Sequence, residues 1–296
     1  MTMRIAVGIA TMGRAEIAAA AVQCLQQQTR RPDAVLIAAP TPDDVPRMPH
    51  DPAVRWIRSE AGLTRQRNCI LREAHGFDIA VFFDDDFLPH PDYLSELENL
   101  FMTSEDIVLA TGYVVADGII GPGFRVEEAQ RLLKTDFPRA GDPNSVSESY
   151  NGYGCNMAVR VSTARRAGVE FDESLPLYGW LEDVDFSRRL RPFGRIVLLP
   201  SARGVHLGAK SGRQSGLRLG YSQIANPIYL ARKGSFAWLR AARQMARNLA
   251  MNIVFSLRPE PYVDRRGRLR GNLLAFRDMV LGKLDPRRIL ALYELQ

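Results

Sequence analysis

Three consecutive carboxylates, Asp84, Asp85 and Asp86, directly follow an apolar run at residues 79–83. Such a run is typical of a buried strand, and open α/β sheets bind ligands beyond the carboxyl ends of their strands. Adjacent carboxylates repel one another unless a cation shares their charge. Oxygen ligands suit Mg²⁺ or Mn²⁺, which usually complete their coordination with substrate phosphates. The triplet therefore predicts a metal–diphosphate site; the alternative is a solvated loop or helix start, where acidic triplets are more common.

Further polar residues follow later in the chain. Glu182 and Asp183 begin a segment with helical spacing, and His206 follows an apolar run at residues 196–199. The order is a strand, an Asp-x-Asp motif, an acidic pair at a helix start, a second strand and a histidine. Motifs in this order resemble those of the family 2 glycosyltransferases of the GT-A fold, and the likeness extends over roughly residues 3–235. The resemblance implies an α/β, Rossmann-like fold with a mainly parallel central sheet flanked by helices.

The hydrophobic pattern by itself also favours an α/β fold. Apolar, β-branched runs alternate with helical patterns along the first part of the chain, the runs at residues 4–10, 34–38 and 54–57 and the helices at 15–28 and 62–76. This alternation predicts βαβ units and a mainly parallel sheet.

We expect three parts along the chain. Residues 1–110 form the nucleotide-sugar-binding half of the GT-A domain, residues 111–209 form the acceptor-binding half, and residues 210–296 form a basic, helical C-terminal extension.

The resemblance implies a metal-dependent transfer of a sugar from a nucleotide-diphosphate donor to a hydroxyl of a saccharide or lipid-linked saccharide. Asp86, Asp84 and His206 would hold Mn²⁺ or Mg²⁺, and Asp84 or Asp85 would contact the ribose, or the metal through water. The other residues expected at the donor are Thr11, Arg14, Arg65, Asn68, Lys210 and Arg213, the last two in a glycine-rich, basic segment that could close over the diphosphate.

The base of the nucleotide is left open by the sequence. The family usually carries an acidic residue that recognises uracil after the second strand, whereas Ala38, Ala39 and Pro40 stand here. A UDP-sugar is the default donor, and GDP and dTDP are alternatives.

Asp183 is the candidate general base, because a carboxylate beside the acceptor can take the hydroxyl proton as the new bond forms. One base and no covalent intermediate imply inversion at the anomeric carbon. The alternative is that the acidic pair only stabilises a helix N-terminus. The expected acceptor-binding residues are Asn151, Gly152, Tyr153, Gly179, Trp180 and Glu182.

Charge is concentrated at the C-terminal end. Residues 207–296 hold 17 Lys and Arg against 5 Asp and Glu, whereas residues 1–206 hold 22 against 28. Residues 236–257 show helical spacing, with apolar residues including Trp238 and Ile253 on one side and Arg240, Arg243 and Arg247 on the other. This pattern predicts an amphipathic helix on an anionic membrane surface; the alternative is a helix packed on the body with its arginines in water. We expect no nucleic-acid partner, because no recognised nucleic-acid module is present.

The remaining features agree with an ordinary globular protein. The composition is 46% hydrophobic and 24% charged, no signal peptide is expected at the N-terminus, and the three cysteines lack metal-type spacing. We therefore expect a cytoplasmic protein, peripheral at the inner face of the membrane, acting on an acceptor such as a polyprenyl-diphosphate-linked glycan.

Two other functions compete with this one. A metal-dependent nucleotidyltransferase would show a glycine-rich basic loop after the first strand, where only Gly13 and Arg14 occur. A non-catalytic sugar-nucleotide-binding or assembly subunit is disfavoured by the intact acidic and histidine motifs. The sequence leaves open the donor sugar, the linkage and the oligomeric state.

Overall fold

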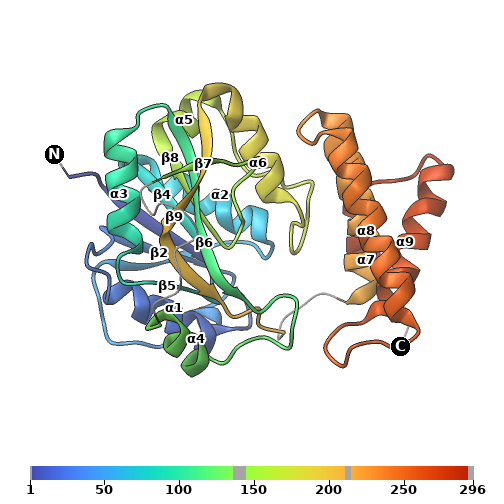
Figure 1. Ribbon diagram of the computed structural model, residues 1–296, viewed down its shortest axis with the longest axis horizontal. Coiled ribbons are helices and arrows are strands. Elements are labelled where there is room, and N and C mark those ends of the chain that lie inside the picture. Colours follow the sequence, from blue (N-terminus) through green and yellow to red (C-terminus); the bar gives the residue numbers. More distant parts are fainter. Residues whose placement is uncertain (1, 136–144, 211–214, 293–296) are drawn as a thin grey trace. The chain divides into compact units, whose positions relative to one another are not determined.

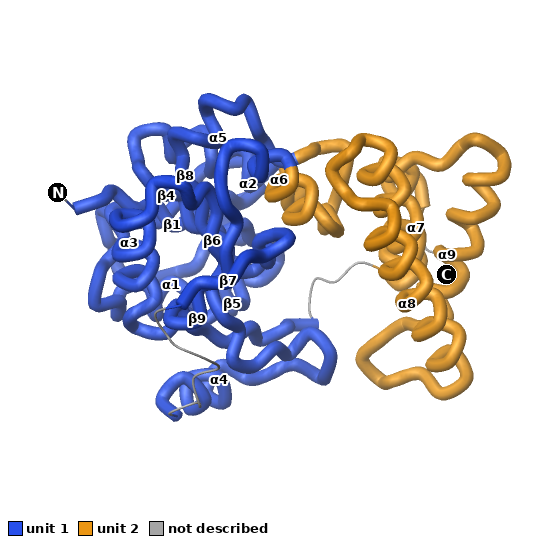
Figure 2. Tube along the Cα trace, turned by 45° about the horizontal axis from the view of Figure 1, so that its top comes forward, with its two compact units in different colours: residues 1–61, 65–171, 189–212 blue, residues 62–64, 172–188, 213–296 orange. Residues whose placement is uncertain are grey.

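A computed structural model describes residues 2–135, 145–210 and 215–292. The chain divides into two compact units, drawn in different colours in Figure 2. Unit 1 comprises residues 1–61, 65–171 and 189–212, and unit 2 comprises residues 62–64, 172–188 and 213–296. The acidic triplet and His206 belong to unit 1, whereas Glu182 and Asp183 belong to unit 2.

Unit 1 is built on one nine-stranded sheet, flanked by helices in Figure 1. The strands are β1 (Ile5–Ala10), β2 (Ala34–Ala39), β3 (Val54–Arg58), β4 (Ile79–Asp84), β5 (Phe87–Pro89), β6 (Ile107–Asp117), β7 (Ser147–Glu148), β8 (Asn156–Arg160) and β9 (Arg195–His206). Their order is β3-β2-β1-β4-β8-β6-β9-β5, with β7 beside β9. The α-helices outside the C-terminal segment are α1 (Ala15–Gln26), α2 (Leu63–Glu73), α3 (Tyr93–Thr103), α4 (Val126–Leu133), α5 (Val161–Ala167) and α6 (Glu182–Leu190).

The predicted α/β fold class is confirmed, and the sheet is mixed beyond its first four strands. Strands β3, β2, β1 and β4 are parallel, as the alternation of strands and helices predicts. Strand β8 then lies antiparallel between β4 and β6, and β5 lies antiparallel to β9. The short strands β5 and β7 carry too few residues for a hydrophobic period, so the sequence pattern did not reveal them.

An aromatic cluster anchors both sides of the acidic triplet. Phe83 precedes the triplet and Phe87 follows it, and their ring centroids lie 4.9 Å apart. The ring of Tyr93 packs edge-on against both phenylalanines. All three side chains are fully buried. Since truncating a buried Phe to Ala typically costs about 3–5 kcal/mol, the backbone that carries the carboxylates is held firmly at both ends.

Unit 2 contains three long helices, α7 (Gly216–Lys233), α8 (Trp238–Ser256) and α9 (Arg265–Val280). The helix predicted at residues 236–257 is therefore present as α8. Within the described residues, no helix is long and apolar enough to cross a membrane.

Buried amides and glycines join these three helices. Asn252 of α8 donates to Gln223 of α7 at 2.8 Å and to Asn272 of α9 at 2.9 Å, and Asn272 donates to the carbonyl of Gly220 at 2.7 Å. A Cβ atom at Gly220 would collide with the backbone of Arg268 in α9. Helices α7 and α9 thus approach at the backbone itself, and the amides satisfy one another where water is excluded.

Candidate active site

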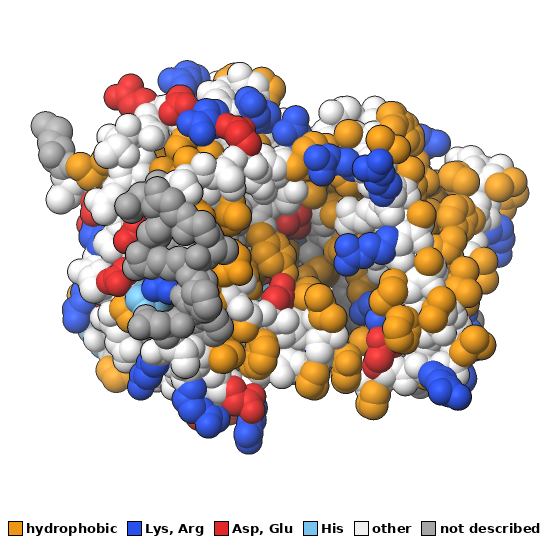
Figure 3. Space-filling view, in the orientation of Figure 1, with side chains coloured by type: hydrophobic (Ala, Val, Ile, Leu, Met, Phe, Trp, Pro, Cys, Tyr) orange, Lys and Arg blue, Asp and Glu red, His pale blue; other side chains and the backbone are white. Residues whose placement is uncertain are grey.

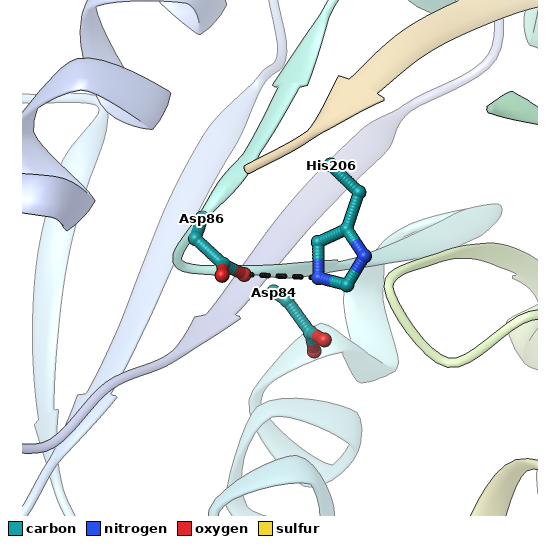
Figure 4. A group of neighbouring side chains, drawn as sticks. All are labelled: Asp84, Asp86 and His206. Carbon is teal, nitrogen blue, oxygen red and sulfur yellow. Dashed lines mark ion pairs between the residues drawn. The ribbon is translucent and has the colours of Figure 1, made fainter. Parts of the chain in front are cut away.

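Two carboxylates and one imidazole meet at the carboxyl ends of β4 and β9 (Figure 4). Strand β4 ends at Asp84, and Asp86 lies in the link to β5. Strand β5 pairs with β9 so that Phe87 is opposite His206, which brings the ring beside Asp86. Nε2 of His206 lies 3.3 Å from Oδ1 of Asp86, and one ligand atom each of Asp84, Asp86 and His206 lies within 4.8 Å of the others.

Each member of the acidic triplet has a different nearest basic side chain, although Arg14 also lies 3.8 Å from Asp86. Asp84 accepts from Arg67 at 2.8 Å. Asp85 is fully buried and forms a two-pronged ion pair with Arg14, at 2.7 and 3.1 Å. Asp86 contacts His206 and accepts from the backbone N–H of Ala209 at 2.8 Å. The three carboxylates thus point to different partners. Asp84 and Asp86 lie close to His206, whereas Asp85 is directed to Arg14.

The pKa values of the site follow from burial and these contacts. Burial raises the pKa of Asp85, and the Arg14 guanidinium opposes that rise. Burial alone would also raise the pKa of Asp86, but hydrogen bonding and charge from His206 outweigh it and lower the value to about 2. Burial alone would lower the pKa of His206, yet its hydrogen bonds to Asp117 and Asp86 raise it to about 10.

Asp117 is a site residue that the sequence did not reveal. It ends β6, directly opposite His206 in the parallel β6–β9 pair. Its Oδ1 lies 2.9 Å from Nδ1 of His206, and its Oδ2 accepts from the hydroxyl of Tyr153 at 2.8 Å. Irregularities shift the β6–β9 register, so this pairing could not be counted from the strand ends.

The segment after His206 is bound to the same corner of unit 1. The N–H of Leu207 donates to the carbonyl of Asp86. The Lys210 ammonium donates to the carbonyls of Gly118 and Ile119 at 3.0 and 3.1 Å. Lys210 thus holds the turn after β6 in this structure, and its predicted contact with a donor diphosphate stays a prediction. Arg213 lies outside the described residues.

The other residues predicted at the donor lie at the ends of β1 and along α2. Thr11 is buried directly after β1, and its carbonyl accepts from Gln66 at 2.9 Å. Arg65 pairs with Glu60 near the surface. Asn68 is buried and bonds both the N–H and the carbonyl of Phe171, at 2.7 and 3.0 Å. Their contacts to a nucleotide stay predictions.

The predicted acceptor loop of unit 1 is anchored to β6 and β8. The amide of Asn151 donates to the carbonyl of Gly152. The N–H of Tyr153 donates to Thr111 at 3.0 Å, and Thr111 in turn donates to buried Asn156 at 2.7 Å. Hydrogen bonds to polar groups of the sheet therefore fix the position of the loop.

In unit 2, the predicted base Asp183 lies in the first turn of α6. Its Oδ1 accepts from the N–H of Val184 at 2.7 Å, a contact that agrees with the helix-start role that the sequence left open. The preceding Glu182 is buried, and its N–H donates to the carbonyl of Gly179 at 2.8 Å. Asp185 is fully buried and pairs with Lys233 of α7 at 2.8 Å.

The turn before α6 adopts an unusual backbone conformation. Leu177 and Leu181 have φ angles of 60° and 73°, which are uncommon for residues with a Cβ, and Gly179 between them has a φ of 61°. The carbonyl of Trp180 accepts from Asn226 of α7 at 2.8 Å. Strain of this kind concentrates at functional sites, which is consistent with a role of this turn in binding.

The family model described as glycosyl transferase family 2 matches residues 8–163, which is more than half of the chain. The chain belongs to glycosyl transferase family 2. None of the curated proteins gives a significant match to the whole sequence.

Solved structures similar to this family 2 glycosyltransferase are themselves glycosyltransferases. GalNAc-T7 with UDP, GalNAc and Mn²⁺ has a TM-score of 0.55 and 15% identity, covering 92% of this chain and 55% of its own. TarS 1–349 of S. aureus with UDP-GlcNAc has a TM-score of 0.56 and 13% identity, covering 98% and 83%. The mannosyltransferase PcManGT from Pyrobaculum calidifontis with GDP-Man and Mn²⁺ has a TM-score of 0.51 and 15% identity, covering 98% and 86%. These likenesses show a shared GT-A fold.

The metal-site chemistry of this family 2 glycosyltransferase suits a divalent cation. Two carboxylate oxygens and one imidazole nitrogen, all buried or half-buried, form a donor set that Mn²⁺ accepts readily and Mg²⁺ accepts through its oxygens. The family assignment also favours glycosyl transfer over the nucleotidyl transfer considered from the sequence.

Proposed function

We propose that this enzyme transfers a hexosyl group, with inversion, from a nucleotide-diphosphate sugar to a hydroxyl of a saccharide or lipid-linked saccharide. The observation that carries the proposal is the convergence of Asp84, Asp86 and His206 at the carboxyl ends of β4 and β9 in a family 2 chain. That edge is where α/β sheets bind their ligands.

Asp84, Asp86 and Nε2 of His206 would hold Mn²⁺ or Mg²⁺ at this edge. The ion would neutralise the charge that develops on the leaving diphosphate. The chain's own part is to orient its ligands. Arg67 donates to Asp84, the Ala209 N–H donates to Asp86, and Asp117 fixes the ring of His206.

Donor recognition rests on residues at the ends of β1, α2 and β9. The proposed set is Thr11, Arg14, Arg65, Asn68, Asp84, Asp85, Lys210 and Arg213. A UDP-sugar is the default, and the crystallised relatives support nucleotide-sugar binding in general, since they contain both uridine and guanosine nucleotides.

Asp183 would take the proton of the acceptor hydroxyl as it attacks the anomeric carbon. A direct displacement by one attacking oxygen inverts that carbon, because no enzyme-linked sugar intervenes. Glu182 would orient the acceptor together with Asn151, Gly152, Tyr153, Gly179 and Trp180. Trp180 offers a flat apolar face of the kind on which sugar rings stack.

The acceptor we propose is a glycan linked to a polyprenyl diphosphate. Such an acceptor stays at the cytoplasmic leaflet, and the basic C-terminal segment would bring the enzyme to that surface. The enzyme would then be cytoplasmic and peripheral at the inner face of the membrane.

The first experiment identifies the donor. The protein is screened for thermal stabilisation by UDP-, GDP- and dTDP-sugars, each with Mn²⁺, with Mg²⁺ and with EDTA. A ligand at a hundred times its dissociation constant raises stability by about 2.7 kcal/mol, which is readily seen as a higher melting temperature. Stabilisation that is equal in EDTA would contradict the metal site.

The second experiment separates an enzyme from a binding subunit. Release of nucleoside diphosphate from the stabilising donor is followed with and without metal, in the wild type and in Asp86→Ala. Donor binding without any metal-dependent turnover, with water or a saccharide as acceptor, would support the non-catalytic alternative instead.

A further inference from the structure

Helix α8 leaves most of its surface uncovered. Of its residues, Ala241 and Asn252 are fully buried, and Asn252 belongs to the amide cluster with α7 and α9. Trp238, Leu239, Ile253 and Leu257, which directly follows the helix, are 56, 64, 49 and 81% exposed. The side on which sequence spacing placed Trp238 and Ile253 is therefore turned to solvent rather than packed.

Helical geometry divides the surface of α8 into three sectors. At about 100° per residue, these four apolar side chains fall within a sector roughly 100° wide, whereas the exposed Met251 and Val254 lie on the side of the arginines. Arg243, Arg247 and Arg240 occupy the adjoining sector, and all three are exposed. The buried Ala241 and Asn252 lie in the third. The arginines thus border the exposed apolar sector, instead of lying opposite to it.

The charge of this region has one sign. Residues 234–259 contain four arginines and no acidic residue. Figure 3 shows hydrophobic side chains gathered over the helices of unit 2 with Lys and Arg side chains among them. An uncovered apolar sector bordered by arginines complements a surface that offers anionic headgroups beside hydrocarbon.

We propose that α8 lies in the plane of an anionic bilayer surface, with Trp238, Leu239, Ile253 and Leu257 inserted and Arg240, Arg243 and Arg247 at the lipid phosphates. The inference deepens the lipid-linked acceptor proposed above by naming the surface that would hold the enzyme near it. A second copy of the chain fits this face less well. In a two-fold contact the same patch meets itself, so the second copy would bring further arginines and no acidic partner for them.

The test is flotation of the full chain with vesicles of phosphatidylcholine alone or with 30% phosphatidylglycerol, at low and high salt. We expect binding to the anionic vesicles at low salt, falling about tenfold or more at high salt. The variant Ile253→Glu/Leu257→Glu should lower the partition coefficient about tenfold or more at either salt concentration. Arg240→Gln/Arg243→Gln/Arg247→Gln should abolish the preference for anionic lipid, whereas the matching three Lys substitutions should keep most of it.

The matched control is Met102→Glu on α3 of unit 1, where Met102 is 49% exposed, as Ile253 is. This variant should float like the wild type. Circular dichroism melts verify that each variant is folded, and a variant that does not fold is replaced by Trp238→Gln or Leu239→Gln. Unchanged flotation of the folded Glu variants would overturn the proposal. So would a wild-type dimer that the Glu substitutions dissociate and that does not float.

Vesicle binding is measured without donor, and transfer is measured separately with a soluble saccharide acceptor. A protein that transfers sugar without binding vesicles would refute the membrane surface alone. A protein that binds vesicles without transferring sugar would refute the proposed activity alone.

Discussion

The carboxylate of Asp117 lies 2.9 Å from Nδ1 of His206, and this contact leaves Nε2 of the ring facing Asp86, 3.3 Å away. A carboxylate behind a metal-binding histidine fixes the ring orientation and raises its basicity, and its loss typically costs 10–100-fold in metal affinity. Asp117 would therefore act on the proposed metal through His206.

We predict that Asp117→Ala weakens Mn²⁺ binding by about 10–100-fold, measured by calorimetry on the folded protein. Asp117→Asn, which keeps one oxygen for the Nδ1 proton, should lose less. Tyr153→Phe is the matched control, because it removes only the hydroxyl that donates to Asp117. Equal metal affinity in Asp117→Ala and the wild type would exclude the orienting role.

The three carboxylates of the triplet should differ in their effects on metal binding. Asp84→Asn and Asp86→Asn should each weaken Mn²⁺ binding strongly, and Asp86→Ala should abolish turnover. Asp85→Asn should leave metal affinity within a few-fold of the wild type, since Asp85 is directed to Arg14. Calorimetry measures the Mn²⁺ affinity of the three variants. If Asp85→Asn alone lost affinity, Asp85 would be the metal ligand in place of Asp84 and Asp86.

Asp183→Asn should separate binding from chemistry. The base acts on the acceptor proton alone, so donor affinity should stay near that of the wild type while kcat falls about 10²–10⁴-fold. Donor affinity is measured by thermal shift and turnover by nucleotide release. Asp185→Asn tests the neighbouring carboxylate, which pairs with Lys233. If Asp183→Asn turned over at the wild-type rate, a different residue would be the base.

The helical unit should be sensitive to acid through Asp172. Burial alone would raise the pKa of Asp172, but hydrogen bonds from Lys233, the Ser174 N–H and Tyr229 together outweigh it and lower the value to about 2. A carboxyl with a depressed pKa in the folded state stabilises the protein above its ordinary pKa of about 4, and this contribution is lost as the pH falls toward 2.

Lys233→Met should therefore reduce the stability of the fold at pH 7. It should also make the further loss of stability between about pH 4 and pH 2 smaller than in the wild type. The same ammonium also pairs with fully buried Asp185, and breaking a buried ion pair by removing one partner costs about 3–5 kcal/mol. Since Lys233 itself is partly exposed, the lower figure is the better guide. The pH dependence of stability is measured by acid unfolding, monitored by circular dichroism. Arg232→Met, at the neighbouring exposed position, is the control. A pH profile identical to the wild type would contradict the assignment.

Much of the scaffold could be predicted because it depends on local patterns. Buried strands such as β1 and β4 are continuous apolar runs, and the acidic triplet follows the last of them. That Asp84, Asp86 and His206 gather was expected from the order of the motifs. The sequence could not show that the irregular β6–β9 register places Asp117 beside His206. It also could not show that Asp85 pairs with Arg14 instead of joining Asp84, Asp86 and His206.

The C-terminal unit was harder to predict for a different physical reason. Helix α8 is identified by its own amphipathic spacing, but its inward side holds Ala241 and Asn252 rather than large apolar residues. Helices α7 and α9 share an apolar cluster that includes Ile224, Ile228 and Ala275, but their closest approach is through glycines and amides, which carry no hydrophobic period. The apolar spacing of α8 would ordinarily indicate the buried side of a helix, but here the side chains of Trp238 and Ile253 are exposed to solvent.

This mode of helix contact leaves a recognisable trace in the sequence. Gly220 and Gly271 are required because a methyl group at either position would strike the backbone of the facing helix. Gln223, Asn252 and Asn272 depend on one another, since losing one removes a hydrogen-bond partner from a buried neighbour. These five positions form a compact signature by which the same helical module could be traced in distant chains, even where it is attached to a different catalytic domain.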